Sequence, residues 1–317
     1  MMFCLCCGKK IDQTNSVDGW HKTCIKKFFG TNDFPQISLG DADEEYEKLA
    51  EGLIGSNKSV TGVQKKLSLH LSKEDGTYRL TLIGYPQGYI LKPNSKEYVC
   101  IAEAEHLVMN MASLFNIQTP LQGLINIKKE INQYAYITKR LDRENNNKIH
   151  MEDFCQLSNK PTEYKYNGSY EKCAKIIDTY SLYPLADKTE LFNRILFCYI
   201  TGNSDMHLKN FSLIETNGGY ILSKQYDLLP VKILINDEED LALTLNGKKK
   251  NITRNDFVKF GENIGMNNNA IRKLIDYGIS KEEKMIEMVK ESFLNDEYKM
   301  KFINLLTDRI TRLKNII

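Results

Sequence analysis

Apolar and polar residues alternate in short runs through the first half of the chain, which is the period of half-buried β-strands. A helical period over residues 98–115, followed by Pro120, interrupts these runs. The pattern therefore predicts a small β-rich unit with one inserted helix, preceded by an acidic linker helix at residues 41–53. The expected strands cover residues 67–71, 78–83, 89–93, 121–127 and 134–141.

The second half of the chain has mostly helical spacing. Residues 185–200 form its most apolar helical pattern, so we expect this helix in the core. The whole pattern predicts an α+β fold with a small β-rich lobe at residues 41–143 and a larger helical lobe at residues 144–317. The other expected elements are helices at 151–157 and 169–181, strands at 211–214 and 219–223, a weakly alternating run at 241–245, and three or four amphipathic helices after 253.

Composition narrows the class of protein. The 317 residues are 42% apolar, and 43 basic against 41 acidic residues give a net charge of +2. This balance gives no overall field that favours nucleic acid, so we expect no direct nucleic-acid binding. We find no apolar run of about 18 residues and no apolar segment typical of a signal peptide. The sequence therefore predicts a cytoplasmic protein that does not bind membranes.

Four of the eight cysteines lie in the first 24 residues, and the others are scattered through apolar runs, which favours a reducing compartment. Cys4 and Cys7 are separated by two residues, as are His21 and Cys24. Two such pairs joined by a short loop predict a tetrahedral, structural zinc site in a knuckle at residues 1–40. Free thiols or a disulfide are the alternative, and Cys6 competes with Cys7 for the first pair.

A polar loop, TGNSDMHLKNF at residues 201–211, follows the most apolar helix and contains Asp205 and Asn210. Phosphoryl transfer to a hydroxyl group uses a carboxylate that takes the proton and an amide oxygen that helps to hold Mg²⁺. Asp227 follows the next strand pattern, where a kinase keeps its main metal-binding Asp. The alternative is a polar loop with an Asn-Ser turn and a capping Asp.

Three further features precede this loop in the order found in two-lobed kinases. Residues 55–66 are rich in Gly, Ser and Thr and offer backbone N–H groups to phosphate. Lys92 ends an apolar strand, and Glu105 lies in the second turn of the next helix, where we expect it to pair with Lys92. Residues 137–143 run from a strand into a charged connection, as a kinase hinge does. The alternatives are a common turn and a solvated charge.

The chain resembles the HipA family of bacterial serine/threonine kinases, the toxins of type II toxin–antitoxin systems. The resemblance spans roughly residues 56–250 and implies the two-lobed protein-kinase-like fold of that family. Its most specific part is the Gly-x-x-Asp-x-His-x-Lys-Asn pattern of residues 202–210. The other matching segments are residues 59–66, 90–93, 105–107, 139–143 and 226–227.

The resemblance implies a role for each matching residue. Asp205 is the expected catalytic base, and Asn210 and Asp227 are expected to bind Mg²⁺. Lys92 is expected to hold the ATP phosphates, with Glu105 as its partner. His207 and Lys209 complete the signature, and Lys209 is a candidate for contacting the γ-phosphate. The remaining nucleotide contacts are expected from the loop at Gly62, Val63 and Gln64 and from the backbone of Lys139, Arg140 and Leu141, although the family often has Glu and Phe in place of Lys139 and Leu141.

The family also suggests regulation and partners. A Ser at the Ser59 position is autophosphorylated in the family, and short members also use the Thr61 position. The chain lacks room for the N-terminal β subdomain of the longest members, so it resembles the short HipT kinases, for which a separate small protein supplies that subdomain. The zinc-like knuckle resembles the N-terminus of other short members.

The family resemblance implies a kinase toxin that phosphorylates a translation factor of the aminoacyl-tRNA synthetase class and binds a DNA-binding antitoxin. Two alternatives stay open. One is a catalytically weak binding module in an antitoxin–DNA repressor complex, and the other is a kinase that acts on a lipid or a small molecule.

Overall fold

The computed structural model describes residues 2–38, 66–82, 87–94, 97–128, 133–144, 147–235 and 238–315. The linker helix expected at residues 41–53 lies outside these ranges. The chain forms two compact units. The first unit comprises Met1–Asn110, Pro120–Lys148 and Glu291–Phe293, and the second comprises Met111–Thr119, Ile149–Lys290 and Leu294–Ile317.

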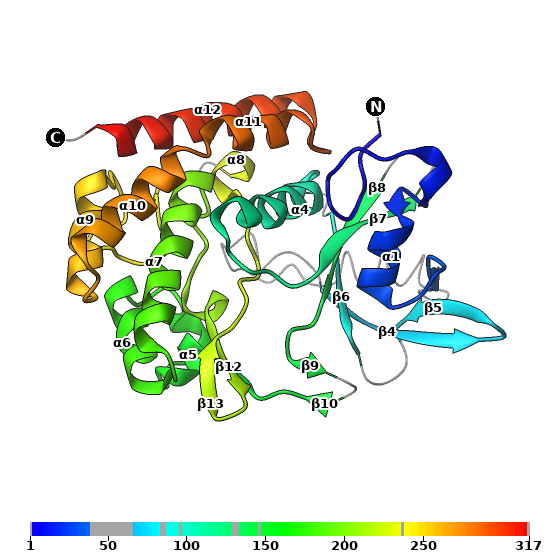
Figure 1. Cartoon of the computed structure of the whole chain (residues 1–317), viewed down its shortest axis with the longest axis horizontal. Coiled ribbons are helices and arrows are strands. Elements are labelled where there is room, and N and C mark those ends of the chain that lie inside the picture. The colour runs from blue at the N-terminus through cyan, green and yellow to red at the C-terminus, as the bar shows by residue number, and fades with distance from the viewer. Residues whose placement is uncertain are drawn as a thin grey trace. The chain divides into compact units, whose positions relative to one another are not determined.

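The first unit contains a six-stranded sheet with the order β3-β5-β4-β6-β8-β7 (Figure 1). All neighbouring strands are antiparallel except β3 and β5. Asp75 and Gly76 both have positive φ angles and form the two-residue turn between β4 and β5, which suits the right-handed twist of a hairpin. The strands are β3 (Gln36–Ser38), β4 (Leu67–Glu74), β5 (Thr77–Thr81), β6 (Tyr89–Pro93), β7 (Gln122–Lys128) and β8 (Gln133–Lys139).

Helix α4 (Ile101–Met111) follows β6 and ends in a 3-10 turn (Ala112–Phe115), which confirms the helix expected at residues 98–115. The side-chain oxygen of Asn94 accepts a hydrogen bond of 2.8 Å from the backbone nitrogen of Ala102, and this bond satisfies a donor in the first turn. All of the first nine residues of α4, from Ile101 to Met109, are buried. The helix is therefore fixed in its unit by packing along most of its surface.

The N-terminal segment of the first unit, residues 2–30, is a small structural element that contacts the sheet. It consists of a 3-10 turn (Gln13–Asn15), the hairpin β1 (Ser16–Val17) and β2 (Trp20–His21), and helix α1 (Lys22–Phe29). Helix α1 buries Ile25, Phe28 and Phe29, and Gly30 ends it in the left-handed conformation. Two short strands, β9 (Arg143–Glu144) and β10 (Asn147–Lys148), complete this unit.

The second unit is mostly helical and is built around α7 (Pro184–Thr201), which has a continuous buried run from residue 191 to residue 201. This confirms the core helix expected at residues 185–200. Among the described residues, no helix is long and apolar enough to cross a membrane. The other helices are α5 (Phe154–Leu157), α6 (Tyr170–Tyr180), α8 (Val231–Leu234), α9 (Arg254–Asn263), α10 (Asn268–Ile279), α11 (Glu282–Lys290) and α12 (Asp296–Lys314).

A three-stranded antiparallel sheet in the second unit corrects one expectation. The helix predicted at residues 151–157 is instead strand β11 (Met151–Asp153) followed by the short helix α5. Asp153 caps α5 through a reciprocal capping box with Gln156, so the helix begins only at Phe154. The preceding residues pair with β12 (Ser212–Thr216), which in turn pairs with β13 (Gly219–Leu222). The weakly alternating residues 241–245 form bends and isolated bridges.

Candidate active site

Lys92 and Glu105 form a buried ion pair in the first unit. Lys92 lies on β6 and Glu105 on α4, and the distance from Lys92 Nζ to Glu105 Oε1 is 2.5 Å. Only 3% of the Lys92 side chain and 1% of the Glu105 side chain are exposed. Buried charges are stable when they are paired, and removal of either partner leaves an uncompensated charge. The structure thus confirms the expected pairing, which fixes the ammonium group at the end of its strand.

The charged connection after β8 is fixed by Asp142. Arg140 binds both carboxylate oxygens of Asp142 at 2.9 Å, and Arg143 binds one of them at 2.6 Å. Burial alone would raise the pKa of Asp142, but the two guanidinium groups outweigh it and hold the pKa below its ordinary value. The backbone nitrogens of Lys139 and Arg140 donate to the backbone oxygens of Leu121 and Gly88. Because these two nitrogens already have acceptors, the groups left for the expected adenine contact are the backbone nitrogen of Leu141 and the backbone carbonyl groups of this segment.

The loop after α7 in the second unit carries Asp205. Gly202 ends α7 with a φ angle of 71°, and a Cβ atom at this position would lie 2.5 Å from Leu305 Cδ2. Glycine is required here because both the backbone conformation and the space exclude a side chain. Asn203 Oδ1 then accepts a hydrogen bond of 3.1 Å from the backbone nitrogen of Asp205. This bond orients the start of the loop. Asp205 itself is almost completely buried, with 5% of its surface exposed.

Asn210 is oriented by the same loop. Its Nδ2 atom donates a hydrogen bond of 2.9 Å to the backbone oxygen of Asp205, so its Oδ1 atom points to the other side of the amide group. Asp227 has a positive φ angle of 54°, and its backbone oxygen accepts a hydrogen bond from Asn203 Nδ2 at 3.5 Å. Carboxylate and amide oxygens are the ligands that Mg²⁺ prefers, so the donor set of Asp227 and Asn210 fits this ion.

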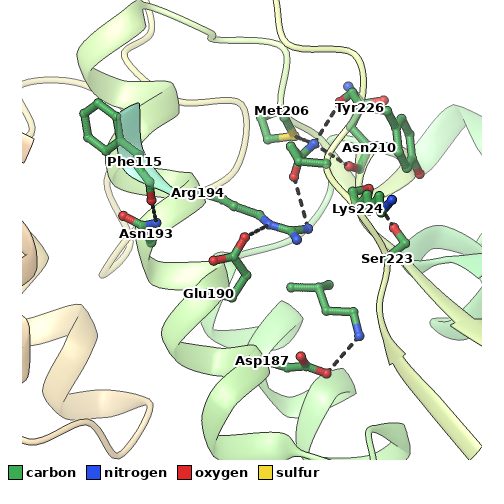
Figure 2. Close-up of polar contacts among 12 residues, drawn as sticks. Phe115, Asp187, Glu190, Asn193, Arg194, Met206, Asn210, Ser223, Lys224 and Tyr226 are labelled. Atoms are coloured by element: carbon green, nitrogen blue, oxygen red, sulfur yellow. Dashed lines mark hydrogen bonds and ion pairs between the residues drawn. The ribbon is translucent and has the colours of Figure 1, made fainter. Parts of the chain in front are cut away.

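A buried polar chain connects α7 to these residues, as Figure 2 shows for Glu190, Arg194 and Asn210. Arg194 donates to Glu190 at 2.7 Å and to Gln225 Oε1 at 3.4 Å. Gln225 Nε2 in turn donates to the backbone oxygens of Asn210 at 3.2 Å and of Tyr226 at 2.8 Å. One amide group therefore contacts both the loop that carries Asn210 and the segment that carries Asp227.

His207 is a neutral, buried imidazole in the same loop. Burial lowers its pKa to about 4, and neither ring nitrogen has a hydrogen-bond partner among the described residues. Its ring lies edge-on to the ring of Tyr166, with the centroids 5.0 Å apart. Tyr166 also donates a hydrogen bond from its hydroxyl group to Asp205 Oδ1. Tyr166 thus contacts two of the residues in the signature loop.

Lys209 points to a different partner from the one expected. Its ammonium group forms an ion pair of 2.7 Å with Asp153, the residue that caps α5. The predicted contact of Lys209 with the γ-phosphate stays a prediction. The predicted loop residues Ser59, Thr61, Gly62, Val63 and Gln64 lie outside the described residues.

The four predicted metal ligands come together in the N-terminal segment. One ligand atom from each of Cys4, Cys7, His21 and Cys24 lies within 4.8 Å of the others. His21 Nε2 donates to the backbone oxygen of Lys10 at 3.1 Å, which leaves Nδ1 as the ligand atom, and Nδ1 lies 3.5 Å from Cys7 Sγ. All eight cysteines are free thiols, and Cys6 donates to the backbone oxygen of Gln122. Three thiols and one imidazole can hold a metal ion.

Three residues of the site were not predicted from the sequence. Tyr166 lies in an irregular segment with no periodic signal, and Gln225 lies in a short connection after β13. Arg194 had a detectable signal because it follows Glu190 by four residues and lies inside the mostly apolar, buried run of residues 191–201. An ion pair at this spacing within a buried helix indicates a polar group that needs partners.

Comparisons with known proteins identify the family of this chain. The family described as HipA-like C-terminal domain matches residues 58–290. A protein named "Putative kinase" from Haemophilus influenzae is 33% identical over 264 residues, which cover 74% of this chain and 76% of that protein.

Two solved structures have a similar fold. HipA of Shewanella oneidensis, from a complex of HipA, HipB and operator DNA, has a TM-score of 0.71 and 20% identity over 86% of this chain and 70% of that chain. The Helicobacter pylori proinflammatory kinase CtkA has a TM-score of 0.51 and 15% identity, and the similarity covers 77% of this chain and 93% of that chain. The fold is therefore the α+β kinase-like fold that the sequence predicted, and the chain belongs to the HipA-like kinase family.

Proposed function

We propose that this protein is an ATP-dependent serine/threonine protein kinase that acts as the toxin of a toxin–antitoxin system. The observation that carries the proposal is the loop that holds Asp205 and Asn210. It supplies a buried carboxylate and an amide oxygen in fixed positions. Phosphoryl transfer depends mainly on positioning and on charge stabilisation, and it requires both of these groups.

Each residue then has a chemical role. Lys92, fixed by Glu105, bonds to the ATP phosphates, and the backbone near Leu141 contacts adenine. Asn210 Oδ1 and the Asp227 carboxylate would hold Mg²⁺, and the ion would supply positive charge to the phosphate groups. Asp205 orients the hydroxyl group of the substrate and accepts its proton. The buried Gln225 and Arg194 maintain the geometry of the loop.

We also propose that the cluster of Cys4, Cys7, His21 and Cys24 binds one structural Zn²⁺. Zinc accepts thiolate and imidazole ligands in a tetrahedral arrangement, and a structural site uses four protein ligands. The His21 ring is already fixed by its bond to Lys10, as metal-binding histidines usually are. Soft thiolate ligands favour zinc over Mg²⁺ or Ca²⁺.

The partners and the substrate are proposed from the family. The Shewanella oneidensis HipA structure contains HipB and operator DNA, and by analogy we propose a DNA-binding antitoxin for this chain. A separate small partner protein, of the kind that supplies an N-terminal subdomain to the short HipT kinases, and a substrate of the aminoacyl-tRNA synthetase class are proposed from the resemblance to those kinases. Autophosphorylation of Ser59 or Thr61 is proposed on the same ground.

Incubation of the protein with Mg²⁺ and γ-labelled ATP, alone and with a bacterial lysate, tests the proposal. Label on the protein itself and on one lysate protein supports a protein kinase. Absence of ATP turnover supports a binding module in a repressor complex. Label in an organic extract supports a lipid or small-molecule kinase. The last two results reject the proposed function.

A further inference from the structure

We propose that the metal bound by Cys4, Cys7, His21 and Cys24 holds the Lys92–Glu105 ion pair in place, so that metal occupancy controls nucleotide binding. The inference rests on the nucleotide role proposed above for Lys92. It arises from the contacts of the N-terminal segment, which touches the strand that carries Lys92 and the helix that carries Glu105. All of these contacts lie within the first unit.

The first ligand pair, Cys4 and Cys7, encloses the residues that contact α4 and β7. The backbone oxygen of Leu5 accepts a hydrogen bond of 2.7 Å from the backbone nitrogen of Leu124 on β7. The backbone oxygen of Cys6 accepts a bond of 3.1 Å from Nε2 of His106, which is 3% exposed. His106 follows Glu105 directly in α4. The position of this ligand pair is therefore linked to the helix that carries Glu105.

The second ligand pair, His21 and Cys24, is continuous with residues that contact β7 and β6. Trp20, which precedes His21 and is fully buried, donates from Nε1 to the backbone oxygen of Leu124 at 2.9 Å. Phe28 and Phe29 of α1 pack against Tyr89, with ring centroids 5.6 Å and 5.7 Å apart. Tyr89 begins β6, three residues before Lys92. This ligand pair is therefore linked to the strand that carries Lys92.

A metal ion joins the two ligand pairs through four bonds, and hence joins their contacts with α4 and β6. In Figure 1 the blue N-terminal segment lies beside α4 and β7, in agreement with these hydrogen bonds. A segment of this size has too little core to hold its shape alone, so metal binding supplies much of its folding energy. Loss of the metal releases the ligand pairs from each other and removes support from both partners of the ion pair.

Gly123 marks the place where both parts of the segment contact the sheet. A Cβ atom there would lie 2.5 Å from Trp20 Cη2 and 3.2 Å from the Cα atom of Cys6. Gly123 is neither a metal ligand nor a predicted nucleotide contact. The substitution Gly123→Val therefore separates the segment from the sheet while all four ligands remain.

The test measures ATP affinity with and without zinc. The purified protein is treated with a zinc-selective chelator in excess Mg²⁺, and the Kd for ATP is determined before treatment, after treatment and after zinc is added back. Trp20 is the single tryptophan of the chain, so its fluorescence reports the state of the segment independently of activity. We expect zinc removal to shift Trp20 emission to the red and to weaken ATP binding roughly tenfold, with recovery on add-back.

Glu105→Gln distinguishes control through the ion pair from general destabilisation. In this variant the pair is already broken, so we expect zinc removal to weaken ATP binding by less than roughly twofold, since effects that act through one interaction are not additive. Gly123→Val should weaken ATP binding as zinc removal does while it retains zinc, and Cys6→Ser should behave as the wild type.

An equal loss of affinity in the wild type and in Glu105→Gln would overturn the inference, as would unchanged wild-type affinity without zinc. If ATP binding depends on zinc but no phosphate is transferred, the inference stands and the proposed kinase function fails.

Discussion

Tyr166 donates a hydrogen bond from its hydroxyl group to Asp205, the proposed catalytic base. The ring of Tyr166 also packs edge-on against His207, and the backbone oxygen of its neighbour Lys165 accepts a bond of 3.1 Å from the backbone nitrogen of Leu208. These three contacts hold one segment against the loop that carries the base. Tyr166 is therefore a positioning residue for Asp205.

Tyr166→Phe removes the hydroxyl group and keeps the ring against His207. Because the contact is with the base, we expect kcat for phosphoryl transfer to fall roughly tenfold while the KM for ATP changes little. Steady-state kinetics at varied ATP concentration measures both constants. The matched control is Tyr164→Phe, since Tyr164 lies in the same segment and is 51% exposed. A rise in KM alone, or equal effects of the two substitutions, would contradict a positioning role.

Buried His207 makes stability depend on pH. Burial lowers its pKa from 6.5 to about 4, so the unfolded state binds more protons between these two values. The free energy of unfolding therefore decreases as the pH falls from 6.5 to 4. The contribution of His207 to this decrease is about 3 kcal/mol. Urea unfolding at several pH values, for the wild type and His207→Gln, measures the contribution.

The difference between those two proteins isolates His207, because other buried groups titrate in the same range in both. The pKa of His106 is lowered to about 4 by burial, and that of Glu103 is raised to about 7 by burial. As the pH falls from 6.5 to 4, we expect the free energy of unfolding of the wild type to decrease by more than that of His207→Gln. Parallel curves would show that His207 is not buried as a neutral group.

The N-terminal cluster is expected to carry about one zinc ion per chain. Cys4→Ser combined with Cys24→Ser removes two of four ligands and should abolish zinc binding, because half a tetrahedral site binds far more weakly. Elemental analysis of protein purified without chelators measures the content, with Cys6→Ser as the control that keeps all four ligands. Zinc-free wild-type protein would reject the site.

Much of the fold could be predicted because its elements have strong periodic signals. Helix α7 and strands β4 to β8 contain runs of apolar residues at regular spacing, and the expected pairing of Lys92 with Glu105 follows from their places on a strand and a helix. Strand β11 was predicted as a helix because three residues are too short for a period of two to be distinguished.

The supporting contacts of the site could not be predicted from local patterns. Tyr166 with Asp205, and Gln225 with Asn210, join residues that are 39 and 15 positions apart through irregular segments. The bond between His106 and the backbone oxygen of Cys6 spans 100 positions. Such contacts depend on the tertiary arrangement, and the sequence contains no spacing that indicates them.

Autophosphorylation gives a further prediction. A phosphate group adds a charge of about −1.5 to −2, and in a loop that contacts ATP it repels the triphosphate. We expect wild-type protein to carry phosphate on Ser59, Thr61 or both, and Asp205→Asn to carry none and to bind ATP more tightly. Intact-mass and peptide mass spectrometry measure the modification. An unmodified loop in active enzyme, after long incubation with Mg-ATP, would reject this mechanism and leave the kinase assignment intact.

Transfer of labelled phosphate from ATP by the wild type, Asp205→Asn and Asp227→Asn tests the central claim most directly. The two substitutions remove the base and a metal-binding carboxylate with almost no change in side-chain size, and circular dichroism checks that both variants are folded. The account predicts transfer to a lysate protein and growth arrest on expression for the wild type, and near-complete loss of both for each variant. Full transfer and full toxicity in either folded variant would contradict it.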